Sequence, residues 1–422
     1  MAGGMIKKLK PNSEFSRNVL TLMTGTTIAQ AIPVAITPVL TRLYTPEEFG
    51  LLALFVSISL VFSTIASGRY ELAIMLPEKD EDAINIAALG VLIATILSFV
   101  LFFVVVLFST KLSQLLGNNE IRIWLYFVPC VVWMIGLYNI LKYLNTRKKL
   151  YKDVAISNVY KSTSMVVVQL VLGFIKLGVN GLIIGQIIAH LSANYKLIRN
   201  TVRNFDFKCI NGSVIKYQAK RYINFPKFSL LASLANNLSF NLINIFVPMI
   251  YSLSTLGFYS LAEKMLGIPS SFIGTSIAQV FFQEGALEKQ RTGKVICTFD
   301  GALKKLIVIS IPVFGVLFFV VEDVFGFVFG EDWKIAGTFT MILIPMFAVR
   351  FVVSSVSAID TIMEKQKFFL LFNIILLINN IIILYVSREL PFTEMLTYLS
   401  ISILFIYLIY GVVLRKMAKG EL

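Results

Sequence analysis

The sequence predicts an all-α membrane protein with about twelve transmembrane helices, and three observations support this fold class. First, hydrophobic residues make up 57% of the 422-residue chain and mean hydropathy is +0.80, whereas charged residues supply 15% against the roughly 25% typical of soluble domains. Second, apolar runs of roughly twenty residues recur along the whole chain, and each is long enough to cross a hydrocarbon core of about 30 Å. Third, the net charge of +14 is carried by short segments between these runs, which indicates membrane topology rather than nucleic-acid binding.

The apolar runs give the expected positions of the helices. The eighth span contains Glu263 and Lys264, and the ninth runs into Glu322 and Asp323, so these two are the least certain and a count of eleven stays open. We expect spans at about residues 19–41, 50–68, 84–108, 121–144, 153–175, 179–198, 228–250, 256–281, 306–321, 336–357, 369–386 and 394–414.

Lys and Arg outside the spans are distributed unevenly between the two sides of the membrane. One side holds 27 of them and the other holds 6. Because basic residues are enriched on the cytoplasmic side, we expect both termini to be cytoplasmic. The richer side comprises both termini and the segments 69–83, 145–152, 199–227, 282–305 and 358–368.

The longest of these basic segments lies near the middle of the chain and divides the helices into two sets of six. We therefore expect an N-terminal lobe at 1–198, a cytoplasmic linker at 199–227 and a C-terminal lobe at 228–422. An internal repeat supports this division, because Tyr44-Thr45 followed by Gly50 matches Tyr251-Ser252 followed by Gly257 at an offset of 207. An even number of helices in each half predicts lobes related by a pseudo-twofold axis along the membrane normal, with a substrate path at their interface.

Polar side chains concentrate in the first and seventh spans. Asn237, Asn241 and Asn244 follow an i, i+4, i+7 pattern and share one helix face, and Gln30 and Thr37 pair with Asn237 and Asn244 at the same repeat offset of 207. Since amide groups in hydrocarbon need partners or water, this face is expected to look into the protein or an aqueous cavity. Two interpretations stay open: a lining that hydrogen-bonds sugar hydroxyls, and interhelical hydrogen bonds that pack the bundle.

Three cations lie deep in the spans, namely Lys161, Lys264 and Arg350. A charge near mid-membrane costs about 2.5–3.5 kcal/mol on insertion scales, so it usually faces a cavity or a partner. Cations that line a low-dielectric cavity concentrate anionic ligands, and these three are the candidates to hold a diphosphate. The structural alternatives are local pairing of Lys264 with Glu263 and, for Arg350, pairing with Asp360 or a position at the membrane interface.

Other candidate sites favour structural roles. The acidic cluster at Glu78 and Asp80–Asp82 is interpreted as a solvated loop, and His190 as a hydrogen-bonded helix contact. Cys130, Cys209 and Cys297 lack metal-ligand spacing, so we expect free thiols, no metal and no bound cofactor. The sequence also lacks a phosphate-cradling glycine loop, a nucleophile elbow and a zinc-protease motif, so we expect no catalytic residues and a transporter rather than an enzyme.

The stretch Thr41-Arg42-Leu43-Tyr44-Thr45-Pro46-Glu47-Glu48-Phe49-Gly50, followed by Gly68-Arg69-Tyr70-Glu71-Leu72-Ala73-Ile74-Met75-Leu76-Pro77, resembles the polysaccharide biosynthesis exporters. These are O-antigen and capsule flippases of the multidrug/oligosaccharidyl-lipid/polysaccharide superfamily. The resemblance covers essentially the whole chain. It implies two lobes around a cationic cavity that opens alternately to each side of the bacterial cytoplasmic membrane.

The resemblance further implies an undecaprenyl-diphosphate-linked oligosaccharide as substrate, moved from the inner to the outer leaflet. Lys264 falls where relatives carry a basic cavity residue. Coupling to the membrane potential, H⁺ or Na⁺ and contacts with other polysaccharide assembly proteins are compatible with it, whereas nucleic acid is not an expected partner.

Three other functions stay open at this stage. An ion-coupled multidrug antiporter of the same superfamily would need a membrane-buried carboxylate in the N-terminal half, where Glu71 lies at or beyond the membrane surface. A polymerase or ligase would need a large extracytoplasmic loop, which the span pattern does not provide. A scaffold for polysaccharide assembly would survive mutation of Lys161, Lys264 and Arg350.

Overall fold

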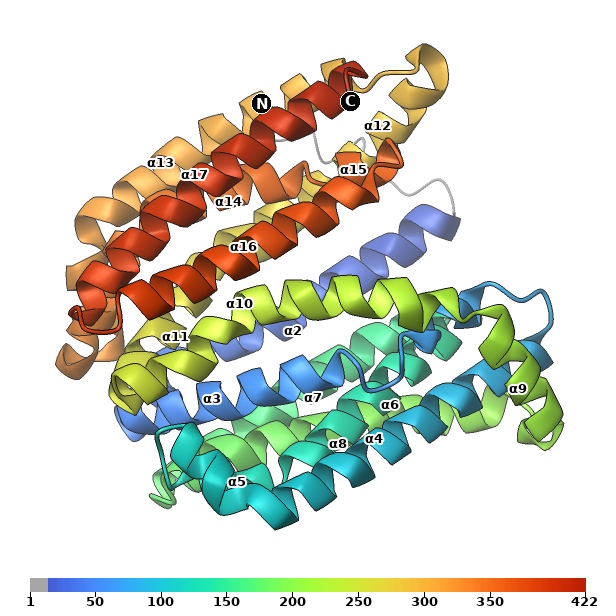
Figure 1. Cartoon of the computed structure of the whole chain (residues 1–422), viewed down its shortest axis with the longest axis horizontal. Coiled ribbons are helices and arrows are strands. Elements are labelled where there is room, and N and C mark those ends of the chain that lie inside the picture. The colour runs from blue at the N-terminus through green and yellow to red at the C-terminus, as the bar shows by residue number, and fades with distance from the viewer. Residues whose placement is uncertain (1–13) are drawn as a thin grey trace. The chain divides into compact units, whose positions relative to one another are not determined.

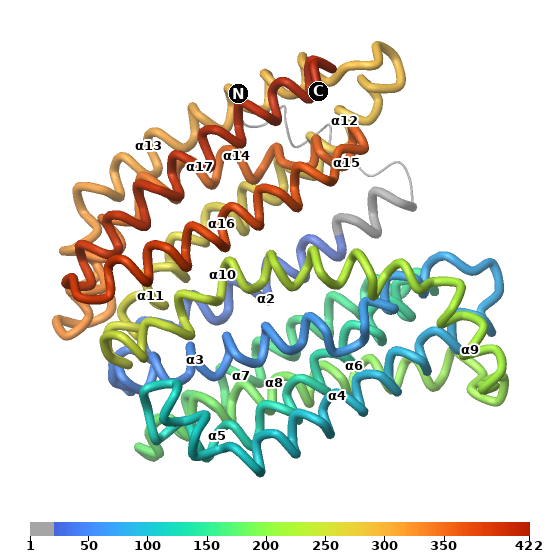
Figure 2. Tube along the Cα trace, viewed as in Figure 1, coloured from blue at the N-terminus to red at the C-terminus, as the bar shows by residue number. Residues whose placement is uncertain are grey.

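The computed structural model describes residues 14–422, with side chains from residue 21 onward, and this part of the chain contains helices and no β-strand. The helices form two compact units (Figures 1 and 2). Unit 1 comprises Met1–Leu43, Ser59–Leu112 and Arg122–Leu231, and unit 2 comprises Tyr44–Ile58, Ser113–Ile121 and Ala232–Leu422. The all-α membrane fold predicted from composition is therefore confirmed.

Unit 1 is built mainly from long helices joined by short turns. The short helices that join them are the 3-10 helices Tyr70–Met75 and Phe207–Cys209 and a π-helical turn at Phe225–Ser229. The α-helices are α2 (Glu14–Leu43), α3 (Pro46–Ser63), which passes from unit 2 into unit 1, α4 (Asp80–Leu115), α5 (Ile121–Leu125), α6 (Val128–Arg147), α7 (Tyr151–Phe174), α8 (Val179–Asn204) and α9 (Gly212–Arg221).

In unit 2, α13, α14, α16 and α17 run alongside one another (Figure 1). A 3-10 helix at Glu331–Trp333 and a π-helical turn at Ser270–Gly274 complete the unit. The α-helices are α10 (Leu230–Ile250), α11 (Leu253–Pro269), α12 (Thr275–Thr292), α13 (Ile296–Phe329), α14 (Lys334–Ser355), α15 (Ile359–Ile362), α16 (Gln366–Val386) and α17 (Phe392–Lys419).

Eleven helical stretches in the described chain are long and apolar enough to cross a membrane. The remaining predicted span corresponds to α8, which has 26 residues but a polar composition. Its polar residues His190 and Asn194 are buried, and the Asn194 amide donates to the carbonyl of Met134 at 2.9 Å. Because α8 turns these polar groups towards α6 and α7, it can cross a membrane without presenting them to lipid.

Several helices extend further than the apolar runs predicted. The segment 282–305, expected between spans, is largely helical because α12 continues to Thr292 and α13 begins at Ile296. The acidic residues Asp80–Asp82 lie in the first turn of α4 rather than in a solvated loop. Carboxylates are favourable at a helix N-terminus, and Asp80 also pairs with Arg147 at 2.7 Å and Lys148 at 2.5 Å.

The two copies of the repeated motif begin helices α3 and α11 in the same way. In the first copy, the Thr45 backbone N–H donates to Glu48 and the Glu48 N–H donates to the Thr45 hydroxyl, which forms a capping box. In the second copy, Ser252 caps α11 by accepting from the N–H of Thr255 at 3.1 Å. These capping positions correspond at the offset of 207, so the repeat is visible in local structure as well as in sequence.

The glycines of the two motifs make reciprocal contacts within unit 2. A Cβ atom on Gly50 would overlap the carbonyl oxygen of Leu253, and one on Gly257 would overlap the carbonyl oxygen of Pro46. Residues 46 and 253, like 50 and 257, are separated by 207 positions. Both positions therefore require glycine so that α3 and α11 can cross backbone to backbone.

Candidate functional site

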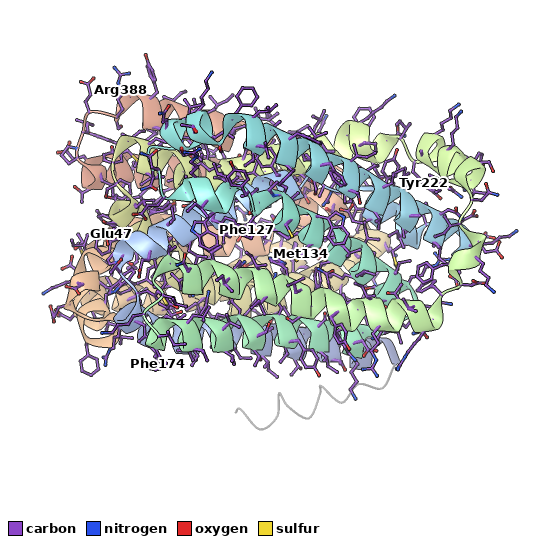
Figure 3. The ribbon with its side chains drawn as sticks, turned by 90° about the horizontal axis from the view of Figure 1, so that it is seen from below. Glu47, Phe127, Met134, Phe174, Tyr222 and Arg388 are labelled. Carbon is purple, nitrogen blue, oxygen red and sulfur yellow. The ribbon has the colours of Figure 1, made fainter. Side chains whose placement is uncertain are left out.

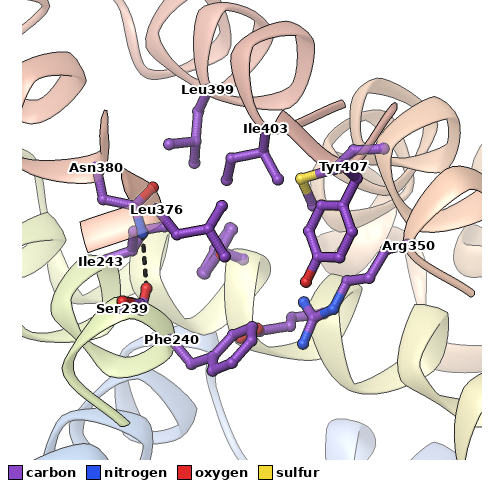
Figure 4. Close-up of a pocket in the computed structure, with 12 residues that line it drawn as sticks. Ser239, Phe240, Ile243, Arg350, Leu376, Asn380, Leu399, Ile403 and Tyr407 are labelled. Atoms are coloured by element: carbon purple, nitrogen blue, oxygen red, sulfur yellow. Dashed lines mark hydrogen bonds between the residues drawn. The ribbon is translucent and has the colours of Figure 1, made fainter. Parts of the chain in front are cut away.

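Unit 2 contains a small, partly open cavity lined by five helices (Figure 4). Its volume is about 30 Å³, which is room for about one water molecule. Arg350 and Glu263 are the charged residues of its lining, and most of the other lining side chains are apolar. The lining residues are Ser239, Phe240, Ile243, Tyr259, Glu263, Met346, Arg350, Leu376, Asn380, Leu399, Ile403 and Tyr407.

Arg350 is held in this cavity mainly by aromatic rings. Its guanidinium carbon lies 4.4 Å from the centre of the Phe240 ring and 5.2 Å from that of Phe347, and Figure 4 shows it beside Tyr407. Cation–π contacts of this kind are worth about 0.5–2 kcal/mol. No salt bridge joins Arg350 to a carboxylate in the described part of the chain. Its positive charge is consequently not neutralised by direct contact.

Glu263 and Asp360 are the two candidate carboxylate partners of the buried cations. Glu263 shares the cavity with Arg350 and acts on it at longer range, and it contacts the side chain of Asn244. Asp360 instead accepts a hydrogen bond from the Thr361 hydroxyl at 3.0 Å, and no salt bridge to Arg350 is found among the described residues. The expected alternative of an Arg350–Asp360 pair is therefore wrong.

Lys264 is turned away from the residue that precedes it. Glu263 belongs to the cavity lining, whereas Lys264 does not and is exposed on the surface of unit 2. Adjacent positions on a helix project in different directions, which explains the separation. The structure thus brings Arg350 and Glu263 together and places Lys264 on another face of α11.

In unit 1, Lys161 lies on α7 beside aromatic and polar side chains. Its ammonium group is 5.9 Å from the centre of the Tyr138 ring, and the Tyr138 hydroxyl donates to Asn158 at 2.6 Å. His190 is an electrostatic neighbour, and its Nδ1 atom is buried without a hydrogen-bond partner; the expected side-chain hydrogen bond is missing at that atom. No salt bridge joins Lys161 to a carboxylate within residues 21–422.

The predicted sugar-binding residues are divided between α2 and α10. Gln30 is exposed, whereas Thr37 is fully buried and donates its hydroxyl to the Pro33 carbonyl at 2.6 Å. The amides of Asn237 and Asn241 donate to carbonyl groups one turn earlier in α10, at 3.2 and 2.9 Å.

These two amides keep their side-chain oxygens as acceptors, and the side-chain oxygen of Asn244 has no hydrogen-bond partner. None of the three residues lines the cavity of unit 2.

A polar seam that sequence reasoning missed joins α10 to α16. The Asn236 amide donates to the Asn373 side chain at 2.6 Å, the Ser239 hydroxyl donates to the Asn373 carbonyl at 2.9 Å, and Asn380 donates to the Ser239 carbonyl at 2.6 Å. These bonds match the expectation that some polar residues of the seventh span pack the bundle. The seven-residue spacing of Asn373 and Asn380 in an apolar run was the available signal.

Between residue 21 and the end of α8, Glu71 is the buried carboxylate that bears on ion exchange. Glu71 is buried, but it lies between the candidate spans Pro46–Ser63 and Asp80–Leu115. It forms a salt bridge with Arg69 at 3.2 Å and accepts a hydrogen bond from Ser67 at 2.5 Å. Its charge is therefore already compensated.

Comparison with known proteins gives a family match and a set of structural neighbours. A family profile described as polysaccharide biosynthesis protein matches residues 39–338. No curated protein sequence gives a significant match. The lipid II flippase MurJ in an inward closed conformation has a TM-score of 0.67 and 15% identity, covering 95% of this chain and 90% of that one.

Transporters of the MATE family and of the MOP superfamily have a similar fold. A MATE transporter in complex with MaL6 has a TM-score of 0.60 and 13% identity, with 95% of this chain and 94% of that one covered. A MOP superfamily transporter from Pyrococcus furiosus has a TM-score of 0.59 and 13% identity, with 96% and 95% covered. At these identities the likeness establishes the fold, which is that of a multi-pass membrane transporter.

Proposed function

The chain belongs to the polysaccharide biosynthesis protein family, and from this premise we propose that it flips an undecaprenyl-diphosphate-linked oligosaccharide across the bacterial cytoplasmic membrane. Such a substrate combines a long apolar tail, a diphosphate and a hydrophilic glycan. The tail can remain in the bilayer while the two polar parts cross, so a flippase must shield charge and hydroxyl groups from hydrocarbon. Export would run from the cytoplasmic to the outer leaflet, with both termini in the cytoplasm.

The observation that carries this proposal is Lys161, a cation within a membrane-spanning helix that has no carboxylate partner in the described chain. A charge near mid-membrane raises the free energy of insertion by about 2.5–3.5 kcal/mol. A neighbouring anion would recover part of this free energy. A diphosphate supplies such an anion transiently, whereas a permanent carboxylate would compete with it. Arg350, held by aromatic rings, has the same chemical character.

We assign the three predicted cations and the polar side chains to different parts of the substrate. Lys161, Lys264 and Arg350 would bind the diphosphate at successive stages of transport, and Gln30, Thr37, Asn237, Asn241 and Asn244 would hydrogen-bond the glycan. The cavity of about 30 Å³ around Arg350 is too small for a sugar. Access of a diphosphate to Arg350 therefore requires helices of unit 2 to move apart, as alternating access does.

Energy for directional transport would come from the membrane potential, H⁺ or Na⁺. An antiporter of drugs is the nearest alternative, since MATE transporters share the fold. The carboxylate of Glu71 in unit 1 is already bound by Arg69 and Ser67. The antiporter therefore has less support than the flippase. Other polysaccharide assembly proteins are expected partners in the membrane.

Depletion of the protein in cells that make a lipid-linked surface glycan tests this function. A membrane-impermeant glycan-oxidising probe, applied to spheroplasts and to permeabilised cells, reports the sidedness of single repeat units. Accumulation of units that react only after permeabilisation would establish translocation as the missing step. Units that reach the outer face but fail to polymerise would instead indicate an enzyme or a scaffold.

A further inference from the structure

The segment that joins α8 to α10 is fixed to unit 1 by specific hydrogen bonds. The Tyr70 hydroxyl donates to the Ala219 carbonyl at 2.9 Å. The Asn85 side chain donates to the Cys209 carbonyl at 3.0 Å and accepts from the Asn211 N–H at 2.9 Å. The stretch 209–219, which includes most of α9, is therefore hydrogen-bonded to the rest of unit 1 at both of its ends.

One face of this segment also completes a hydrophobic cluster of unit 1. Ile215, Ala219 and Tyr222 pack on buried residues that include Tyr70 and Ile74. Figure 3 places Tyr222 at one end of the helices of unit 1 and Phe174 at the other. Residues 199–227 are thus a docked cap on one end of the unit, and the outward side of this cap is available to a partner.

The outward side of the cap carries a dense positive charge, and we call it the basic linker face. All of its Lys and Arg side chains are exposed, and the sole acidic residue of the segment, Asp206, uses a carboxylate oxygen to cap the Lys208 N–H. None of these cations forms a salt bridge within the described chain. They are Arg199, Arg203, Lys208, Lys216, Lys220, Arg221 and Lys227.

Some basic residues in other segments of the same predicted side are paired with carboxylates. Arg147 and Lys148 share Asp80, and Lys289 pairs with Glu364 at 2.9 Å. The cations of the basic linker face have no carboxylate partner within residues 21–422. An external anion would neutralise this charge.

Apolar side chains are interleaved with these cations. Phe207 and Tyr217 are 42% and 60% exposed, and Ile210 and Ile223 are exposed as well. Aromatic and aliphatic groups beside Lys and Arg are typical of segments that lie in the membrane interface. The segment also follows α8 and directly precedes the candidate span Phe225–Ile250, which is the position of a juxtamembrane segment.

We propose that the basic linker face binds the headgroups of anionic phospholipids. These lipids would lie in the leaflet next to the end of unit 1 that carries the cap. Juxtamembrane Lys and Arg clusters are attracted to an anionic membrane surface. The interleaved apolar groups would enter the interface beside the headgroups. This inference concerns the lipid environment and does not depend on which molecule is transported.

Native mass spectrometry of the full-length protein in detergent, titrated with phosphatidylglycerol or phosphatidylcholine, tests the proposal. The main variant is Lys216→Gln/Lys220→Gln/Arg221→Gln. A charge-preserving variant is Lys216→Arg/Lys220→Arg. The control, Lys111→Gln/Arg122→Gln/Lys334→Gln, removes three exposed cations from the opposite predicted side.

The wild type should retain phosphatidylglycerol in preference to phosphatidylcholine, and the preference should weaken as salt is raised. The main variant should lose more than about tenfold in phosphatidylglycerol affinity, while the charge-preserving variant and the control keep wild-type affinity. Equal retention of both lipids by the wild type, or equal loss in the control, would overturn the proposal. A main variant that keeps wild-type affinity for phosphatidylglycerol would also overturn the proposal, and it would point to an acidic protein partner of this face.

Discussion

At the residue scale, Lys161 and Arg350 illustrate how a charge is kept inside a helix bundle with no carboxylate in contact among residues 21–422. Aromatic rings approach both side chains, at 5.9 Å for Lys161 and 4.4 Å for Arg350. Cation–π contacts recover only part of the cost of removing a charge from water. Each cation therefore retains an attraction for a mobile anion, which is the property that a diphosphate carrier requires.

Replacement of Lys161 tests whether this attraction serves transport. Lys161→Gln should reduce the rate of translocation by about tenfold to a hundredfold, because a hydrogen bond to a charged group is worth roughly 1.5–3 kcal/mol, while membrane levels stay unchanged. Lys161→Arg should retain most of the activity. Lys196→Gln is the matched control, since Lys196 already pairs with Asp153 at 3.0 Å; equal loss in both Gln variants would exclude a special role for Lys161.

Arg350 requires a different design because Glu263 shares its cavity. Arg350→Gln alone should lower the thermal unfolding midpoint in detergent, since it leaves a buried carboxylate without a nearby cation. Glu263→Gln/Arg350→Gln should recover the midpoint, yet remain defective in translocation if Arg350 binds substrate. Recovery of both stability and transport in the double variant would show that Arg350 serves only to balance Glu263.

At the element scale, the crossing of α3 and α11 depends on two glycines that stand at equivalent positions of the repeat. The helices approach so closely there that each glycine faces a backbone carbonyl of the other motif. The same motifs also supply the helix caps at Thr45 and Ser252. The two copies of the motif, which are 207 positions apart, share the same local geometry. Together they form one specific helix–helix contact.

Gly50→Ala and Gly257→Ala should each destabilise the protein, because the added methyl group would overlap a backbone oxygen and force the helices apart. Overpacking of this kind costs about 1–3 kcal/mol, and a fall in the thermal midpoint in detergent would report it. Gly315→Ala in α13 is the control, since a Cβ atom there meets no atom within 4 Å and Ala favours the helix. A midpoint for Gly50→Ala equal to that of Gly315→Ala would contradict the close crossing.

At the scale of the whole molecule, composition and hydrophobic runs were sufficient to predict an all-helical membrane protein, because each span must satisfy its own backbone in lipid. The same reasoning located Arg350, since charges in apolar runs are conspicuous. It did not locate Tyr407, Asn373 or Asn380, because their roles depend on which helices pack together. It also predicted some helices too short, as for α13, which begins at Ile296 rather than near residue 306, because helical hydrogen bonding continues into polar sequence beyond an apolar run.

The orientation of the whole molecule can be tested with one native thiol. Cys297 is exposed at the start of α13, on the side that the excess of basic residues assigns to the cytoplasm. Arg388, exposed after α16, lies on the opposite predicted side, because α13, α14 and α16 intervene. A Cys130→Ser/Cys209→Ser protein retains Cys297 alone, and Arg388→Cys in a cysteine-free background provides the matching probe.

A membrane-impermeant maleimide should label Arg388→Cys in intact spheroplasts and Cys297 only after permeabilisation. The opposite result would invert the orientation and place the basic linker face outside. Labelling of both thiols in intact spheroplasts would mean that an even number of crossings separates them, which is incompatible with three spanning helices between residues 297 and 388. The measurement therefore tests the charge rule and the helix count of unit 2 together, independently of any transported substrate.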